Sequence, residues 1–127
     1  LEGIPNIING DLFINFNTSL KSLRHLPSKI YGDFEFTYCN IKNFKNTKST
    51  IIGNLNGTNN DITTLDNFPT VEGDIFLSYE SLPDKIIYNR NRVKEIINNQ
   101  NFYKIWNEDG SFNVKRFNIM IDDIRND

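Results

Sequence analysis

The sequence contains few of the residues on which common catalytic and metal sites depend. Its 127 residues include one cysteine, one histidine, one tryptophan and one methionine. A single cysteine excludes an internal disulfide framework and suits a reducing compartment, so we expect a cytoplasmic location. No zinc-ligand spacing or phosphate-binding glycine loop is present, and no serine or cysteine has an identifiable base partner. We therefore expect a protein that is not an enzyme, with no catalytic residues, metal or cofactor.

Long apolar runs and a strong net charge are also missing. No apolar run approaches the ~20 residues that cross a bilayer, so we expect no membrane partner. The formal net charge is −2, from 14 basic and 16 acidic residues, which gives little attraction for nucleic acid. Basic residues at 90–94 and 104–116 have acidic neighbours, and we interpret them as a solvated helix face. Ten Phe and five Tyr supply enough aromatic volume for a core.

Four glycines recur at a nearly constant spacing. Gly10, Gly32, Gly53 and Gly73 are 22, 21 and 20 residues apart, each with an apolar residue two positions before it and Asp or Asn after it. Such a period indicates a solenoid, whose stacked coils bury their flat sides against one another. We expect the glycines to form corners with positive φ. The positions expected to face the interior are Leu12, Ile14, Phe34, Phe36, Leu55, Gly57, Ile75 and Leu77.

The residues after each glycine resemble the shortest leucine-rich-repeat motif, L-x-L-x-x-N/C-x-L. The second copy reads Phe34-x-Phe36-x-x-Cys39-x-Ile41, and Asn17 and Asn60 stand at the Asn/Cys position of the first and third copies. We expect both asparagines to turn inward and bond to loop backbone, with Cys39 in the same slot. The resemblance covers residues 1–86 and implies an α+β protein, a short leucine-rich-repeat-like β-solenoid of about four ~21-residue coils.

The glycine-aspartate-aromatic variant is similar to a divergent subtype often carried by bacteriophages and large DNA viruses. This resemblance implies a virus-encoded protein in the host cytoplasm that binds or inhibits a host protein. The sequence opens directly on a repeat motif, Leu1 to Pro5. We therefore expect further chain upstream, and self-association through the N-terminal strand edge is a second partner expectation.

Helical signals replace the repeat in the last third of the chain. A partial apolar stripe lies within residues 86–107, and a full stripe follows from Val114 to Ile124. Glu108 to Gly110 predicts a turn, and Ser111 is the expected N-cap of the second helix. We predict a helical C-terminal cap over residues 87–127, packed on the last coil. A docking helix pair is the alternative.

Side chains between the inward positions are expected to share one outer strand face. Aromatic rings beside carboxylates on this face suit a protein interface. In the alternative interpretation, the aspartates cap turns and the rings pack on one another. The predicted partner-binding residues are Phe13, Phe16, Asp33, Glu35, Tyr38, Asp74, Phe76 and Tyr79.

Three functional hypotheses follow. The first is a non-enzymatic protein-protein interaction module that binds another protein through its strand face. The second is a structural repeat domain of a larger virion or surface protein. The third is an enzyme whose site uses the cap groove around Tyr103 and Trp106.

Overall fold

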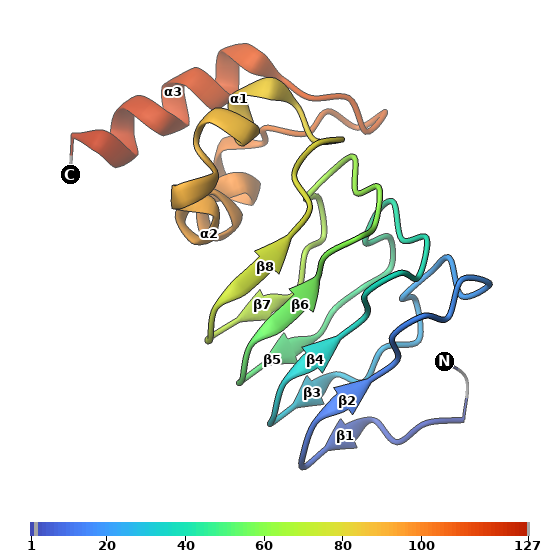
Figure 1. The fold of residues 1–127 in the computed structure, drawn as a ribbon. Coiled ribbons are helices and arrows are strands. Elements are labelled where there is room, and N and C mark those ends of the chain that lie inside the picture. The colour runs from blue at the N-terminus through green and yellow to red at the C-terminus, as the bar shows by residue number, and fades with distance from the viewer. Residues whose placement is uncertain (2, 127) are drawn as a thin grey trace.

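The chain forms a β-solenoid with helices at one end of the stack (Figure 1). The computed structural model describes residues 1 and 3–126. Each coil contributes two short strands, one to each of two four-stranded parallel sheets. The first sheet consists of β1 (Ile7–Ile8), β3 (Lys29–Ile30), β5 (Thr50–Ile51) and β7 (Thr70–Val71). The second consists of β2 (Leu12–Phe13), β4 (Phe34–Glu35), β6 (Leu55–Gly57) and β8 (Ile75–Leu77).

Each strand pairs with the equivalent strand one coil later. In the second sheet Leu12 aligns with Phe34, Phe34 with Leu55, and Leu55 with Ile75. These offsets equal the spacings between the glycines, so the sequence period is the length of one coil. The four rungs enclose about three turns, slightly fewer than the expected four coils. The β-solenoid and the C-terminal helical segment are confirmed.

A file of aromatic rings fills the middle of the stack. Phe34 and Phe36 are fully buried, with ring centroids 5.0 Å apart. Phe36 meets Phe44 edge-on at 6.1 Å, and Phe44 meets Phe68 at 4.7 Å. A Cβ at Gly57 would collide with the Phe36 ring, which explains why this inward position carries no side chain. The remaining inward positions are buried at Leu55 and Leu77 and half-buried at Leu12, Ile14 and Ile75.

The corner glycines are needed for space, and the expected positive φ at these corners is wrong. Among the described glycines only Gly3 and Gly110 have positive φ. A Cβ on Gly53 would stand 2.5 Å from the carbonyl oxygen of Gly32 and 2.6 Å from its carbon. The Gly53 N–H donates to that oxygen at 3.1 Å, and equivalent bonds join the other corners. The coils approach one another so closely here that a side chain does not fit.

The inward asparagine is confirmed in the third coil and wrong in the first. Asn60 is buried, and its Oδ1 accepts hydrogen bonds from the N–H groups of Cys39 and Ile41, at 3.0 Å each. Its Nδ2 donates to the carbonyl of Phe36 at 2.9 Å. Cys39 is buried in the same slot one coil earlier, and its Sγ donates to a first-coil carbonyl. Asn17 is exposed, because this slot bonds to the preceding coil and no described coil precedes Asn17.

The helical segment begins at Asp84, slightly before the expected boundary at residue 87. It contains α1 (Asp84–Tyr88), the 3-10 helix η1 (Arg90–Arg92), α2 (Val93–Tyr103) and α3 (Val114–Arg125). The expected N-cap at Ser111 is wrong. Asn113 caps α3, since its side chain accepts from the Arg116 N–H at 2.9 Å. Ser111 instead belongs to the preceding turn, where its N–H donates to Asp109 at 2.9 Å.

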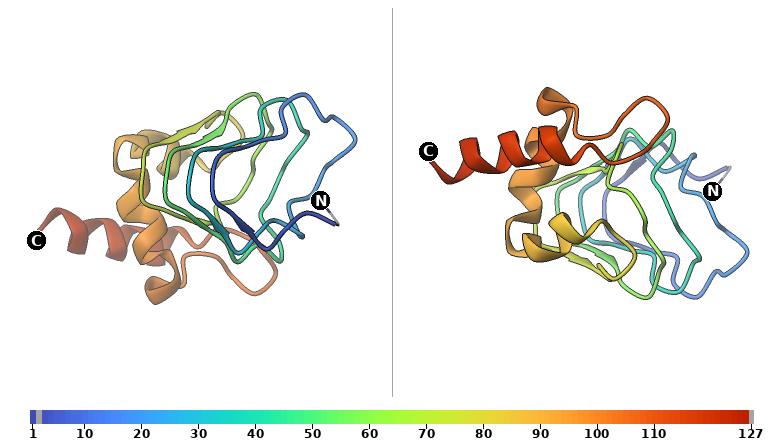
Figure 2. Two further views of the ribbon diagram at one scale, coloured as in Figure 1. Left: turned by 90° about the horizontal axis from the view of Figure 1, so that it is seen from below. Right: turned by 90° about the horizontal axis from the view of Figure 1, so that it is seen from above.

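Helix α2 joins the helical segment to the last coil. Gln100 is buried, and its Nε2 donates to the carbonyl of Leu65 at 2.7 Å. α3 packs on α2. In views along the stack, the C-terminal part of α3 extends past the outline of the coils (Figure 2). Among the described residues, no helix has the length and apolar content to cross a membrane.

Candidate functional site

The outer face of the β2-β4-β6-β8 sheet carries the predicted partner-binding residues. Strand pairing places Phe13, Glu35, Asn56 and Phe76 in one file across the four strands. Phe13 is 55% exposed and Phe76 is 50% exposed, while the two polar residues between them are half-buried. The expected outward orientation is therefore confirmed, with an aromatic ring at each end of the file.

Beside this file, Phe16 and Tyr38 form an exposed aromatic pair. Their ring centroids are 4.9 Å apart and the rings are nearly parallel, at 9°. Phe16 is 71% exposed and Tyr38 is 46% exposed. Both residues have left-handed backbone, with φ of 62° and 56°, and Asn59 has φ of 61° at the same place in the third coil. In these three coils the corner therefore adopts a conformation that asparagine tolerates and that bulky residues rarely adopt, whereas Tyr79 at the equivalent place of the last coil is not left-handed.

A polar network underlies the aromatic pair. The Oδ1 of Asn15 accepts hydrogen bonds from both the N–H and the Oγ1 of Thr37, at 2.8 Å each. Its Nδ2 donates to Glu35 Oε1 at 3.1 Å. These bonds connect the Glu35 carboxylate to the residues next to Phe16 and Tyr38 in the sequence, so the polar part of this face is ordered.

The aspartate file has a structural role. Asp11 Oδ1 accepts from the Asp33 N–H at 2.7 Å, and Asp33 Oδ1 accepts from the Asn54 N–H at 2.8 Å. Asn54 Oδ1 in turn accepts from the Asp74 N–H at 2.8 Å. Each side chain thus bonds to the backbone of the next coil, as the turn-capping interpretation expects. Asp33 uses one carboxylate oxygen in such a bond. Asp74 is the last residue of the file, and only its backbone N–H takes part.

Asp74, Phe76 and Tyr79 lie at the junction between β8 and the helical segment. They line a cavity of about 350 Å³ together with Arg90 and Arg92. Burial raises the pKa of the Tyr79 phenol, and the nearby Arg90 opposes this rise. The predicted set is thus divided into this cap-end group and an N-terminal group, with the third-coil residues 54–59 between them.

The basic residues of the helical segment have more specific positions than the expected solvated face. Lys94 lines the junction cavity, and its Nζ donates to the carbonyls of Glu72 and Gly73 at 2.9 and 2.8 Å. Arg92 pairs with Glu95 at 3.6 Å. The sequence does not predict these two bonds of Lys94, because nothing in the local pattern indicates which carbonyls its ammonium group reaches.

The described residues 1 and 3–126 contain no cluster typical of a metal site. No group of three or more His, Cys, Asp or Glu side chains in this part of the chain could hold a metal ion. Cys39 is buried, and His25 is exposed in the segment between the two sheets.

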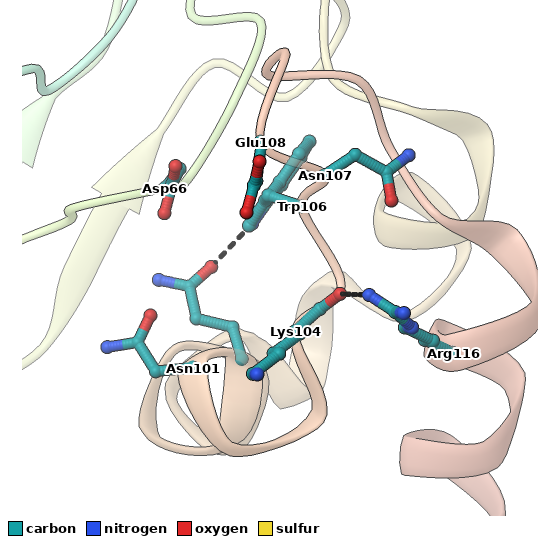
Figure 3. Close-up of a pocket in the computed structure, with 8 residues that line it drawn as sticks. Asp66, Asn101, Lys104, Trp106, Asn107, Glu108 and Arg116 are labelled. Atoms are coloured by element: carbon teal, nitrogen blue, oxygen red, sulfur yellow. Dashed lines mark hydrogen bonds between the residues drawn. The ribbon is translucent and has the colours of Figure 1, made fainter.

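The helical segment carries a second cavity, of about 420 Å³ (Figure 3). Trp106 lines it, as expected for the cap groove. Tyr103 does not line it, and its hydroxyl donates to Asp123 at 2.6 Å. The remaining lining residues come from the last coil, from α2 and α3, and from the loop that joins these two helices.

Comparison with models of protein families, with curated proteins and with solved structures found no match. The class that the structure itself defines is a parallel β-solenoid followed by a helical segment.

Proposed function

We propose that this chain is a non-enzymatic protein-interaction module that binds its partner through the N-terminal part of the strand face. The observation that carries this proposal is the exposed, left-handed pair Phe16 and Tyr38. Phe13, Asp33 and Glu35 belong to the same N-terminal part of the face, on β2 and at the start of β4. Aromatic residues over a polar rim are typical of the contact centre of protein interfaces.

Phe16 and Tyr38 have strained backbone but remain largely outside the core. A left-handed conformation destabilises a non-glycine residue by roughly 1–2 kcal/mol, and asparagine reduces this penalty through local hydrogen bonds. Asn59 shows that the third coil uses the tolerant residue at the same corner. Phe16 keeps 71% of its surface exposed, so the stack on Tyr38 rather than burial in a core opposes this strain. A strained and exposed residue pair points to a role outside the fold.

We further propose the leucine-rich-repeat-like type for the solenoid. The Asn60 and Cys39 slots support it, since both residues bond to the backbone of the preceding coil. We also propose a viral source and a host protein as partner, on the basis of the resemblance alone, and a cytoplasmic location, on the basis of the single cysteine and the resemblance.

The test replaces the pair by the residue of the third coil, Phe16→Asn with Tyr38→Asn. Asparagine relieves part of the left-handed strain at two positions, which opposes the loss of about 0.5–1.5 kcal/mol from the ring stack, so the free energy of unfolding should fall by less than ~1 kcal/mol or rise slightly. Capture of the partner from a lysate of the native host should be lost. Phe102→Asn is the matched control, because Phe102 is 83% exposed on α2 and should not affect capture.

Two outcomes contradict the proposal. Unfolding of the double variant at much lower denaturant would show that the pair is structural. Equal capture by the double variant, the control and the parent chain would place the contact elsewhere.

A structural repeat domain is the second candidate. Within the described chain β1 and β2 each pair on one side only, and Leu12 and Ile14 are half-exposed beside this edge. Stacking of a second copy would satisfy that edge. Sedimentation velocity should then show self-association that increases with concentration, whereas a monomer at high concentration argues against this role.

A further inference from the structure

Some side chains that line the cavity in the helical segment are held by hydrogen bonds, and others have no hydrogen-bond partner within the described residues. Gln100 is 2% exposed, and its Oε1 accepts from the Trp106 Nε1 at 2.8 Å. Asn107 Nδ2 donates to Ser111 Oγ at 2.9 Å, and the Arg116 guanidinium donates to the Lys104 carbonyl at 3.3 Å. These bonds hold the indole and its surroundings in place without a ligand.

Four other lining side chains have no such anchor. Across residues 1 and 3–126, no hydrogen bond or ion pair engages the head groups of Asp66, Asn101, Lys104 or Glu108. Asp66 and Glu108 lie on one side of the cavity, and Asn101 and Lys104 lie on the other (Figure 3). The cavity therefore presents two carboxylates on one side and an amide and an ammonium on the other, with an indole ring in its lining.

The charges of the lining residues cancel. Asp66 and Glu108 are acidic, and Lys104 and Arg116 are basic. A site for a simple anion or cation would show an excess of the opposite sign. A neutral ligand with several hydroxyl groups suits this lining better, because each hydroxyl can donate to a carboxylate and accept from an ammonium or an amide. The indole offers apolar surface for the carbon-bound hydrogens of such a ligand.

We propose that this cavity binds a neutral polyhydroxylated ligand of the saccharide class. Trp106 contacts the ring of the sugar, and Asp66, Glu108, Asn101 and Lys104 bond to its hydroxyl groups. The cavity volume of about 420 Å³ lies within the roughly 300–1,000 Å³ typical of ligand sites, so a short saccharide fits. This site is separate from the Phe16–Tyr38 face, so either proposal can fail alone.

The chain contains its own reporter, because Trp106 is the single tryptophan. The full chain is titrated with cellobiose, maltose, lactose and chitobiose, and separately with inorganic phosphate and diglycine as charged probes. We expect a saturable change in tryptophan emission, or in the indole N–H and Asn101 amide resonances, with at least one disaccharide. No change at all with the four sugars, or a response only to the charged probes, would overturn the proposal.

Variants connect the signal to the cavity. Asp66→Ala with Glu108→Ala should weaken disaccharide binding by about tenfold or more, since hydroxyl groups of the sugar lose their carboxylate acceptors. Because neither head group has a partner within the described chain, the thermal unfolding curve should be unchanged. If the double variant does not fold, Asn101→Ala replaces it, with the same expected direction. Asp61→Ala, outside the cavity, is the control. Equal affinity of the cavity variants and the parent chain would show that the proposed contacts are wrong.

Discussion

Two junctions in this protein join stacked backbone by different chemistry. Between coils, equivalent positions repeat the same bond, and the N–H of one corner glycine donates to the carbonyl of the glycine before it. At the last coil, α2 supplies a side chain instead, and the Lys94 Nζ donates to the Gly73 carbonyl at 2.8 Å. The Lys94 ammonium thus takes the place of the donor that the corner glycine of a further coil would supply to Gly73.

The end of a solenoid can therefore be covered by a helix whose side chains bond to backbone carbonyls of the coils next to it. A coil presents fixed backbone donors and acceptors, and only another coil matches all of them. A helix matches a few of them, through side chains long enough to reach individual carbonyls. We therefore expect substitutions between coils to destabilise the protein more than substitutions at the α2 junction.

The largest effect is expected at Asn60. Asn60→Ala leaves the buried N–H groups of Cys39 and Ile41 and the Phe36 carbonyl without their partner. Each unsatisfied group is unfavourable by about 1–3 kcal/mol, so the free energy of unfolding should fall by roughly 3–4 kcal/mol if water reaches part of the site. Urea denaturation followed by circular dichroism measures this loss.

Asn17→Ala is the matched control for Asn60, at the same position of the first coil. Asn17 is exposed, so its substitution should change the free energy of unfolding by less than ~0.5 kcal/mol. Similar losses for the two variants would show that the coil-to-coil bonds of Asn60 are not what stabilises this slot.

The next effect is expected at a corner glycine. Gly53→Ala places a methyl group 2.5 Å from the Gly32 carbonyl oxygen, so adjacent coils must separate. Overpacking of this kind destabilises by about 1–3 kcal/mol, and we expect the upper part of that range. Gly10→Ala is the control, because nothing lies within 4 Å of its added Cβ. Equal unfolding midpoints for the two variants would contradict the close-approach explanation.

Much of the solenoid could be predicted because each coil repeats one local geometry. The glycine spacing gave the strand register, and the alternation after each glycine separated Phe34 and Phe36 from the outward Glu35. Features that depend on a neighbouring coil could not be predicted in this way. The glycines are necessary for close backbone contact between adjacent coils rather than for φ. Asn60 bonds to the coil before it, and within the described residues no coil precedes Asn17.

The candidate face was predicted less completely. Alternation identified its outward residues, including Phe13 and Phe76, but not their separation into an N-terminal group and a cap-end group. The left-handed corner at Phe16 and Tyr38 had one signal in the sequence, because Asn59 occupies the equivalent position and asparagine favours that conformation. The roles of Gln100 and Lys94 depend on how α2 meets the last coil, which no local pattern encodes.

At the α2 junction, Gln100 should have the larger effect. Gln100→Leu removes the bonds to the Leu65 carbonyl and the Trp106 Nε1 while retaining most of the side-chain volume. We expect a loss of about 1–2 kcal/mol in the free energy of unfolding. The tryptophan emission of the folded protein should also change, since the indole loses its partner. Unchanged emission and stability would mean that the cap does not depend on this bridge.

The smallest effect is expected at Lys94. Lys94→Met keeps the aliphatic stem and removes the ammonium that bonds to the Glu72 and Gly73 carbonyls. Because these carbonyls are near solvent, water replaces the lost donor, and the free energy of unfolding should fall by only about 0.5–1 kcal/mol. Lys115→Met, on the exposed surface of α3, is the control for loss of one positive charge. A loss at Lys94 as large as that of Asn60→Ala would instead show that the helix closes the stack as strongly as another coil does.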